Sequence, residues 1–146
     1  MIVQYELLED LDSPDISYQD NAMIRGNEFS IQNGYNETKL ALNSTTKPTA
    51  IFALSSTILL GAVKALKEHK VRIPQDMSII SFDDNLYLDY LNPPITRIAQ
   101  SLENIGIIAV KMLMQKILEE TELHSEILLK PNIIKRDSIK VLTDRK

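Results

Sequence analysis

The sequence predicts an α/β fold in which helices flank a parallel sheet, giving a three-layer arrangement. Apolar runs that are typical of strands covered on both faces alternate with amphipathic helical patterns, and the strand–helix–strand order recurs along the chain. Parallel neighbours need such crossover helices, so the repeated order indicates a parallel sheet. The length of 146 residues is that of one ordinary domain with a real hydrophobic core.

The first third of the chain predicts two helices and two strands. Apolar residues at helical spacing predict a helix over residues 1–11, and a turn-rich segment then leads to a short strand over residues 22–25. Helical spacing returns over residues 32–43. The run "KPTAIFAL", residues 47–54, has the composition of a buried strand.

The middle of the chain repeats this order. The triplet Ser55-Ser56-Thr57 supplies hydroxyls that can accept from the first free amides of a helix, and "ILLGAVKALKEH" predicts that helix over residues 58–69. The segments "MSIISF", residues 77–82, and "ITRI", residues 95–98, predict two further strands. The chain therefore continues as helix and strands of one sheet.

The last third predicts one long helix and a broken strand. Residues 102–120 form an amphipathic pattern whose inner side would carry Ile105, Ala109, Met112, Leu113 and Ile117. The tail contains "EILLKPNIIK", residues 126–135, a strand interrupted by Pro131, followed by "SIKVL".

Composition narrows the class of protein. Sixteen Lys and Arg against twenty Asp and Glu give a net charge of −4, which disfavours nucleic acid as a direct partner. Cysteine is absent, which excludes disulfides and thiolate metal sites and fits an intracellular location. Residues 1–10 lack the basic start of an export signal, and the longest apolar stretches are broken by polar residues. We expect a cytoplasmic protein without membrane contact.

Polar side chains follow two successive strands of the expected sheet. Ser55-Ser56 ends one strand and Asp83-Asp84 ends the next, and in a parallel sheet these ends meet at the edge where ligands bind. A carboxylate there can accept two hydrogen bonds from neighbouring hydroxyls of a polyol. Phe29 would come to the same edge and offer an apolar face to a ring. This combination predicts a sugar cleft.

Other interpretations of the aspartates remain open. Asp84 or Asn85 could cap a following turn while Asp83 faces water, and spacing does not decide between a cap and a binding site. A metal-dependent enzyme would need both carboxylates on one ligand, yet neighbours on a strand point to opposite faces. The chain contains no nucleophile or phosphate-loop motif, and neither of its two histidines, His69 and His124, lies near one, so we expect both to be exposed to solvent. We therefore expect no enzymatic activity, no cofactor and no metal.

Several segments stand in an order that resembles a known family. They are "KPTAIFAL", "GAVKALKEH", "VRIPQDMSIISFDD", "LNPPITRIAQSLENIGIIAVKMLMQKI" and "KRDS". Together, from about residue 25 to 138, they resemble the effector-binding core of the LacI/GalR family of bacterial transcription regulators, which is related to the periplasmic sugar-binding proteins. That resemblance implies two α/β lobes with a small effector between them and a helix-turn-helix domain that contacts DNA.

The resemblance also implies how the chain is divided. Residues 1–98 would be the C-terminal lobe of the effector-binding core without its first strand, and residues 99–127 a crossover helix that normally packs on the absent N-terminal lobe. Residues 128–146 would be the returning tail. The chain would then be truncated, and contact DNA only through a missing N-terminal domain. The uncovered helix would need a partner, which an exchange of segments between chains could supply.

Five ligand-binding positions follow from the resemblance. Asp83 matches the first Asp of the family's Gly-Phe-Asp-Asp strand end, which bonds effector hydroxyls. Phe29 falls where an aromatic residue lines the cleft, with Glu28 beside it, and Gln100 matches the crossover between lobes. Ser55 replaces the family's ligand-binding Asn, a shorter side chain that weakens the case for sugar affinity. The implied effector is a sugar or sugar phosphate.

The family usually dimerises through this lobe, so a homodimer is implied. The matching interface residues are Leu60, Val63, Leu86, Tyr87 and Leu91. Ordinary core packing is the alternative role for the same side chains. The function implied is the effector-sensing and dimerisation part of a LacI-type repressor. The alternative is a sugar-binding module of a transport system, which shares the fold.

Overall fold

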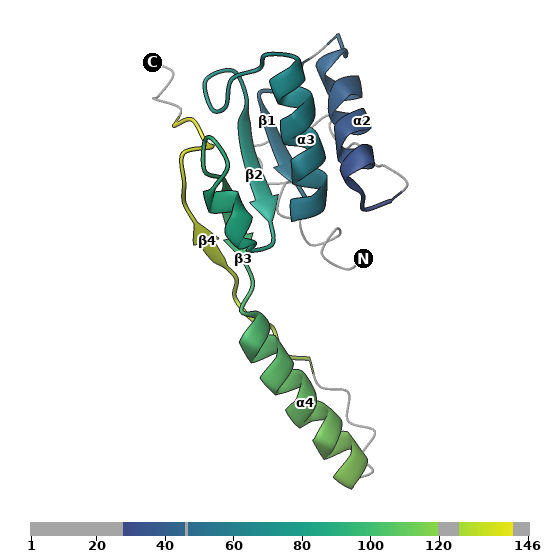
Figure 1. Ribbon diagram of the computed structural model, residues 1–146. Helices are drawn as coiled ribbons and strands as arrows, with labels where there is room; N and C mark the ends of the chain where they lie inside the picture. Colours follow the sequence, from purple (N-terminus) through teal and green to yellow (C-terminus); the bar gives the residue numbers. More distant parts are fainter. Residues whose placement is uncertain (1–27, 46, 120–125, 142–146) are drawn as a thin grey trace, which may run out of the picture.

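The computed structural model describes residues 28–45, 47–119 and 126–141. Figure 1 shows a compact α/β part and one helix that extends away from it. The expected helix over residues 1–11 and the expected strand over residues 22–25 lie outside the described residues. All the remaining helices that the sequence predicts are present.

The centre of the α/β part is a sheet of four described strands in the order β1-β2-β3-β4. Strand β1 (Ala50–Ala53) pairs in parallel with β2 (Ser78–Phe82), and β2 pairs in parallel with β3 (Thr96–Ala99). Strand β4 (Asn132–Ile134) pairs with β3 in the antiparallel direction. The predicted α/β class is confirmed, with a sheet that is mixed rather than wholly parallel.

The direction of β4 has a simple cause. The chain leaves β3 into α4 (Leu102–Glu119), which does not return along a face of the sheet as a crossover helix would. The chain therefore returns to the sheet at the same end at which β3 left it, and β4 must run opposite to β3. Its strand is also shorter than expected, because it begins only after Pro131, which has no amide hydrogen for a ladder.

Helix α3 (Ser56–Glu68) connects β1 to β2 and supplies much of the core. Ser55 caps it, since its hydroxyl oxygen accepts from the Ile58 amide at 3.1 Å. Its inner face buries Leu59 and Leu66 completely, in one cluster with Ile79 of β2. Figure 1 shows helix α2 (Ile31–Leu42) beside α3.

Helices α2 and α3 approach so closely that only glycine fits at their contact. A Cβ on Gly61 would lie 2.0 Å from the Ile31 carbonyl oxygen, and one on Gly34 would lie 2.2 Å from the Ile58 carbonyl oxygen. Tyr35 adds a hydrogen bond at the outer side, from its hydroxyl to Glu68 at 2.6 Å. The glycine spacing thus sets how near α2 can pack.

The tail is tied to the beginnings of β2 and β3 by Ser138. Its buried hydroxyl donates to the Ile79 carbonyl at 2.6 Å and accepts from the Thr96 amide at 2.8 Å, while the Ile79 amide donates to the Ser138 carbonyl at 2.9 Å. Thr96 also exchanges hydrogen bonds with the backbone of Arg136. The segment after β4 is therefore a turn whose hydrogen bonds hold β2 and β3 together at their beginnings.

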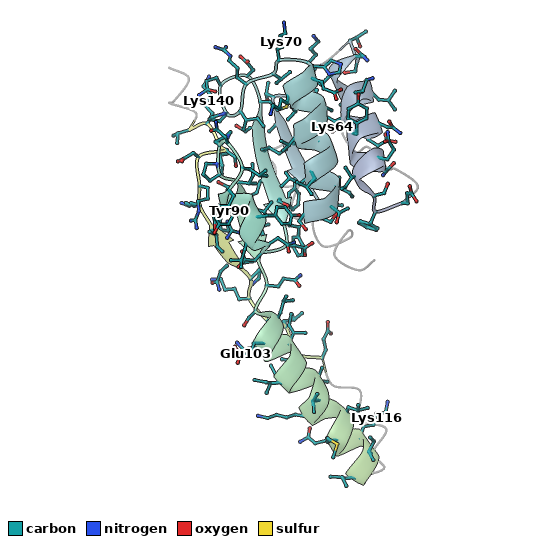
Figure 2. The ribbon with its side chains drawn as sticks, in the orientation of Figure 1. Lys64, Lys70, Tyr90, Glu103, Lys116 and Lys140 are labelled. Carbon is teal, nitrogen blue, oxygen red and sulfur yellow. The ribbon has the colours of Figure 1, made fainter. Side chains whose placement is uncertain are left out.

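Helix α4 projects from the sheet, with its side chains spread around it (Figures 1 and 2). The inner stripe that the sequence predicts is not buried, because Ile105, Leu113 and Ile117 are 38%, 58% and 62% exposed. The part of α4 up to Met112 lines a groove together with residues 127–131 and with Phe82 and Ile98 of the sheet. Within the ranges that the structure describes, no helix combines the length and apolar character needed to cross a membrane.

Gly61→Ala should lower the free energy of unfolding by about 1–3 kcal/mol, because the added methyl group meets rigid backbone rather than a flexible side chain. Urea denaturation of the chain would measure the change. Gly106→Ala is the matched control, since a Cβ there meets nothing within 4 Å and alanine favours an exposed helix. Equal stability of Gly61→Ala and the unchanged chain would contradict the close helix packing.

Candidate functional site

The candidate site is the edge of the sheet at which β2 ends and at which α2 and α3 begin (Figure 1). A hydrogen bond of 2.5 Å from the Asn85 side chain to the Ser56 hydroxyl joins the first residue of α3 to the turn after β2. The structure therefore brings the serine turn and the aspartate turn together. Parallel pairing of β1 with β2 makes this possible, because both strands end on the same side.

Ser55 and Asp83 present different groups at this edge. Ser55 is half-buried and uses its oxygen to cap α3, which leaves its hydroxyl hydrogen for an acceptor. Asp83 is half-buried and has no hydrogen-bonding or charged partner among the described residues. The Ser55 hydroxyl can thus donate a hydrogen bond to a polar ligand, and the two Asp83 carboxylate oxygens can accept from one.

Asp83 also marks a sharp change in backbone direction. Its φ is +78°, in the left-handed region that residues with a Cβ rarely adopt. The strand has ended at Phe82, so the alternation of side chains no longer governs Asp83 and Asp84. The two carboxylates accordingly meet different surroundings.

Asp84 is bound to a buried arginine that the sequence reasoning missed. Arg97 of β3 is 3% exposed, and its Nε donates to Asp84 at 2.5 Å. Its two terminal nitrogens donate to the two carboxylate oxygens of Asp89 at 2.9 and 3.0 Å. Arg136 donates to Asp89 as well, at 2.7 Å. We call these four residues the Arg97 network.

The Arg97 network shifts the pKa values of Asp89 and Arg97. Hydrogen bonds from Arg97 and then from Arg136 hold the pKa of Asp89 far below its ordinary value. The bonds to Asp89 and Asp84 in turn raise the pKa of Arg97, although burial opposes this. A signal for the network was present in "ITRI", because an arginine inside a short apolar strand needs carboxylate partners.

The capping alternative for Asp84 and Asn85 is wrong at the level of side-chain contacts. Asn85 stands at the N-cap of the short 3-10 helix η2 (Leu86–Asp89), yet its side chain makes no capping hydrogen bond and contacts Ser56 instead. Asp84 binds Arg97. Asp84 therefore links the turn after β2 to β3, and Asn85 links the same turn to α3.

Glu28 and Phe29 lie just before α2. The carboxylate of Glu28 accepts from the Ser30 hydroxyl at 2.9 Å, and its carbonyl accepts from the Asn33 side chain at 2.8 Å. Ser30 in turn caps α2 through the Asn33 amide. Glu28 is thus engaged in local capping, whereas the Phe29 ring is 74% exposed at the end of the molecule where α2 begins.

Gln100 lines an apolar groove at the root of α4. An apolar groove of about 610 Å³ separates the root of α4 from the returning segment, and Gln100 lines it with Phe82 and Ile98. Ser55, Asp83, Phe29 and Glu28 are not among the lining residues. The parallel register pairs Phe82 with Ile98, so Gln100 follows β3 at the end of the sheet at which Asp83 follows β2.

The residues expected at a dimer interface fall into two groups. Val63, Tyr87 and Leu91 are partly buried against the core and Leu60 is half-buried, whereas Leu86 is 80% exposed. Tyr90, which the sequence reasoning did not select, is 87% exposed at the end of η2 and is labelled in Figure 2. An exposed apolar surface thus exists around η2.

Metal chemistry finds no support in the described ranges. No cluster of three or more His, Asp or Glu side chains suited to a metal ion occurs within them. The carboxylates of Asp84 and Asp89 are instead neutralised by arginine.

Comparison with known proteins defines the class of the chain. The family model described as the periplasmic binding protein-like domain matches residues 15–139. The chain therefore belongs to the periplasmic binding protein-like domain family.

Individual relatives agree with the resemblance to LacI-type regulators. The ribose operon repressor of Haemophilus influenzae is 36% identical over 76% of this chain and 33% of its own length. The repressor PurR of Pasteurella multocida is 35% identical over 77% of this chain and 34% of its own length. A LacI family transcriptional regulator from Enterococcus faecium, solved with bound ribose, is 33% identical with a TM-score of 0.67, over 77% of this chain and 41% of that one.

These matches confirm the similarity to the effector-binding part of LacI family regulators. The chain spans about a third of the length of the curated relatives it matches. Those relatives are named as repressors rather than enzymes.

Asp89→Asn should make the free energy of unfolding depend less on pH in the acid range. The lowered pKa of Asp89 means that its stabilisation is complete above the ordinary carboxyl pKa of about 4 and is lost as the pH falls below it. The difference in urea midpoint between the unchanged chain and Asp89→Asn should therefore be largest at pH 6 and narrow by pH 3.

Arg97→Met should flatten the acid limb in the same way, because it removes the main cause of the lowered pKa. Asp76→Asn breaks an exposed pair with Arg72 and serves as the control, with a smaller difference at pH 6 because solvent screens that pair. A difference for Asp89→Asn that stays constant across this pH range would contradict the role of the network.

Proposed function

We propose that the chain is the effector-sensing part of a LacI-type repressor that acts in the cytoplasm and binds a sugar at the edge formed by Ser55 and Asp83. The observation that carries this proposal is the Asn85–Ser56 hydrogen bond, which unites the two turns that follow parallel strands. Ligands of open α/β sheets bind beyond the carboxyl ends of the strands. The named repressors among the relatives favour a regulator over a transport protein.

The chemistry of the edge suits a sugar. The Asp83 carboxylate can accept hydrogen bonds from adjacent hydroxyls, and Ser55 can donate one to a further sugar oxygen. Phe29 supplies an apolar ring face at the same end of the molecule. The Enterococcus faecium regulator was solved with ribose, so a pentose is the first ligand to test.

The domain division expected from the sequence remains part of the proposal. Helix α4 would pack on a second lobe, which explains why its apolar side chains are exposed in this chain. Ligand binding between two lobes would change their closure, and closure would alter DNA affinity through a helix-turn-helix domain of a longer protein. Gln100 lies at the root of α4 and would belong to the crossover.

We also propose that the regulator is a homodimer that uses the surface around η2. Leu86 and Tyr90 are large apolar or aromatic side chains that a monomer would leave in water. Leu60 and Val63 lie on α3, and the part of each that remains accessible would extend this surface. Tyr87 and Leu91 pack against the core and would hold the η2 segment in place beneath this surface.

Asp83→Asn should abolish or strongly reduce ribose binding, because the amide removes the charged acceptor. Asparagine tolerates a left-handed φ nearly as well as aspartate does, so the turn should survive the change. Titration of the chain with ribose, followed by saturation-transfer NMR, would measure the dissociation constant. We expect an increase of about tenfold or more, the equivalent of one lost hydrogen bond to a charged group.

Asp76→Asn is the matched control, since Asp76 lies before β2 and pairs with Arg72 on the surface. Its dissociation constant should equal that of the unchanged chain. No saturable ribose binding, or equal binding by Asp83→Asn, would overturn the proposed site.

A further inference from the structure

The two adjacent carboxylates after β2 differ in what they contact. Asp84 is held by Arg97, and Asp83 has no partner among the described residues. Their separation occurs at one backbone torsion, the positive φ of Asp83. Something must hold this turn, because a left-handed residue with a side chain costs of the order of a kcal/mol.

Arg97 is placed to hold it. Register pairs Arg97 with Ser81, and Phe82 with Ile98, so the guanidinium starts from the strand beside β2, two residues from the turn. It is 3% exposed and is fixed at its far end by both oxygens of Asp89. A guanidinium with a rigid fork and restricted mobility defines where its partner Asp84 can lie.

The network also fixes the other end of the same loop. Asp89 closes η2, and Arg136 of the tail binds Asp89 from a third segment. The loop from Asp84 to Asp89 is therefore bound at both ends to one buried cation. Neither of its bound carboxylates is free to turn toward the ligand edge.

We propose that Arg97 is a positioning residue for the sugar site: by binding Asp84 and Asp89 it holds the left-handed turn and leaves the Asp83 carboxylate as the one presented to the ligand. This inference rests on the proposed function. Arg97 acts through Asp83 and does not itself contact the sugar. The arginine inside β3 thereby decides which aspartate serves as ligand.

The test is a double-mutant cycle on ribose binding by the chain. Arg97→Met and Asp83→Asn should each raise the dissociation constant by about tenfold, the scale of one hydrogen bond to a charged group. Arg97→Met in the Asp83→Asn background should add less than about twofold, because a residue that acts only through Asp83 has nothing left to position. Arg72→Met, which removes an exposed arginine of another ion pair, should leave binding unchanged.

Asp84→Asn tests the same contact in case Arg97→Met does not fold. Asp84 is 39% exposed, so the change is mild, and it weakens only the contact from Arg97 to the turn, because the amide oxygen can still accept but carries no charge. Ribose affinity should fall as it does for Arg97→Met, in a variant whose amide NMR spectrum remains that of a folded chain.

The outcomes separate the two proposals. Asp83→Asn that weakens binding, together with Asp84→Asn and Arg97→Met that do not, would overturn the positioning role and leave the sugar site in place. Fully additive effects in the cycle would overturn the positioning role as well. Equal ribose binding by Asp83→Asn and the unchanged chain, or none by either, would overturn the sugar site and the positioning role with it.

Discussion

Parallel pairing of β2 with both β1 and β3 is the constraint on which the rest of the structure depends. It places the ends of neighbouring strands on one edge, and it sends the chain back over the sheet through α3. It also sets Arg97 beside Ser81, close to the turn that ends β2. The tail stabilises the pairing of β2 with β3, because the Ser138 hydroxyl forms hydrogen bonds to Ile79 at the beginning of β2 and to Thr96 at the beginning of β3.

A buried guanidinium is costly unless every carboxylate around it is well placed. Here one arginine binds three segments, namely the turn after β2, the end of η2 and, through Asp89, the tail at Arg136. The network links the proposed sugar edge to the exposed side chains Leu86 and Tyr90. Ligand site and proposed dimer surface thus belong to one loop with a common anchor.

The molecule divides energetically into two parts. The sheet with α2 and α3 has a dense core around Leu59, Leu66 and Ile79, and its helices touch at glycines. Helix α4 has regular backbone but exposed apolar side chains, so its stability as a helix owes little to packing within the described chain. The second lobe proposed above would cover these side chains, and the matched part of the chain corresponds to about a third of the curated relatives.

The sequence by itself determined the α/β class, the helices α2, α3 and α4, the strands β1 to β3, and the cap at Ser55, because periodicity and capping are local properties. It also determined the common edge of the serine and aspartate turns. Only the tertiary structure decided that β4 is antiparallel, that Gln100 lines a groove at the root of α4, and that Asp84 belongs to Arg97 rather than to a cap. These features join residues 13 to 59 positions apart, through bonds such as Arg97–Asp84 and Ser138–Ile79. Spacing along a chain cannot specify which distant partner satisfies a buried charge, since that choice is made when the strands pack.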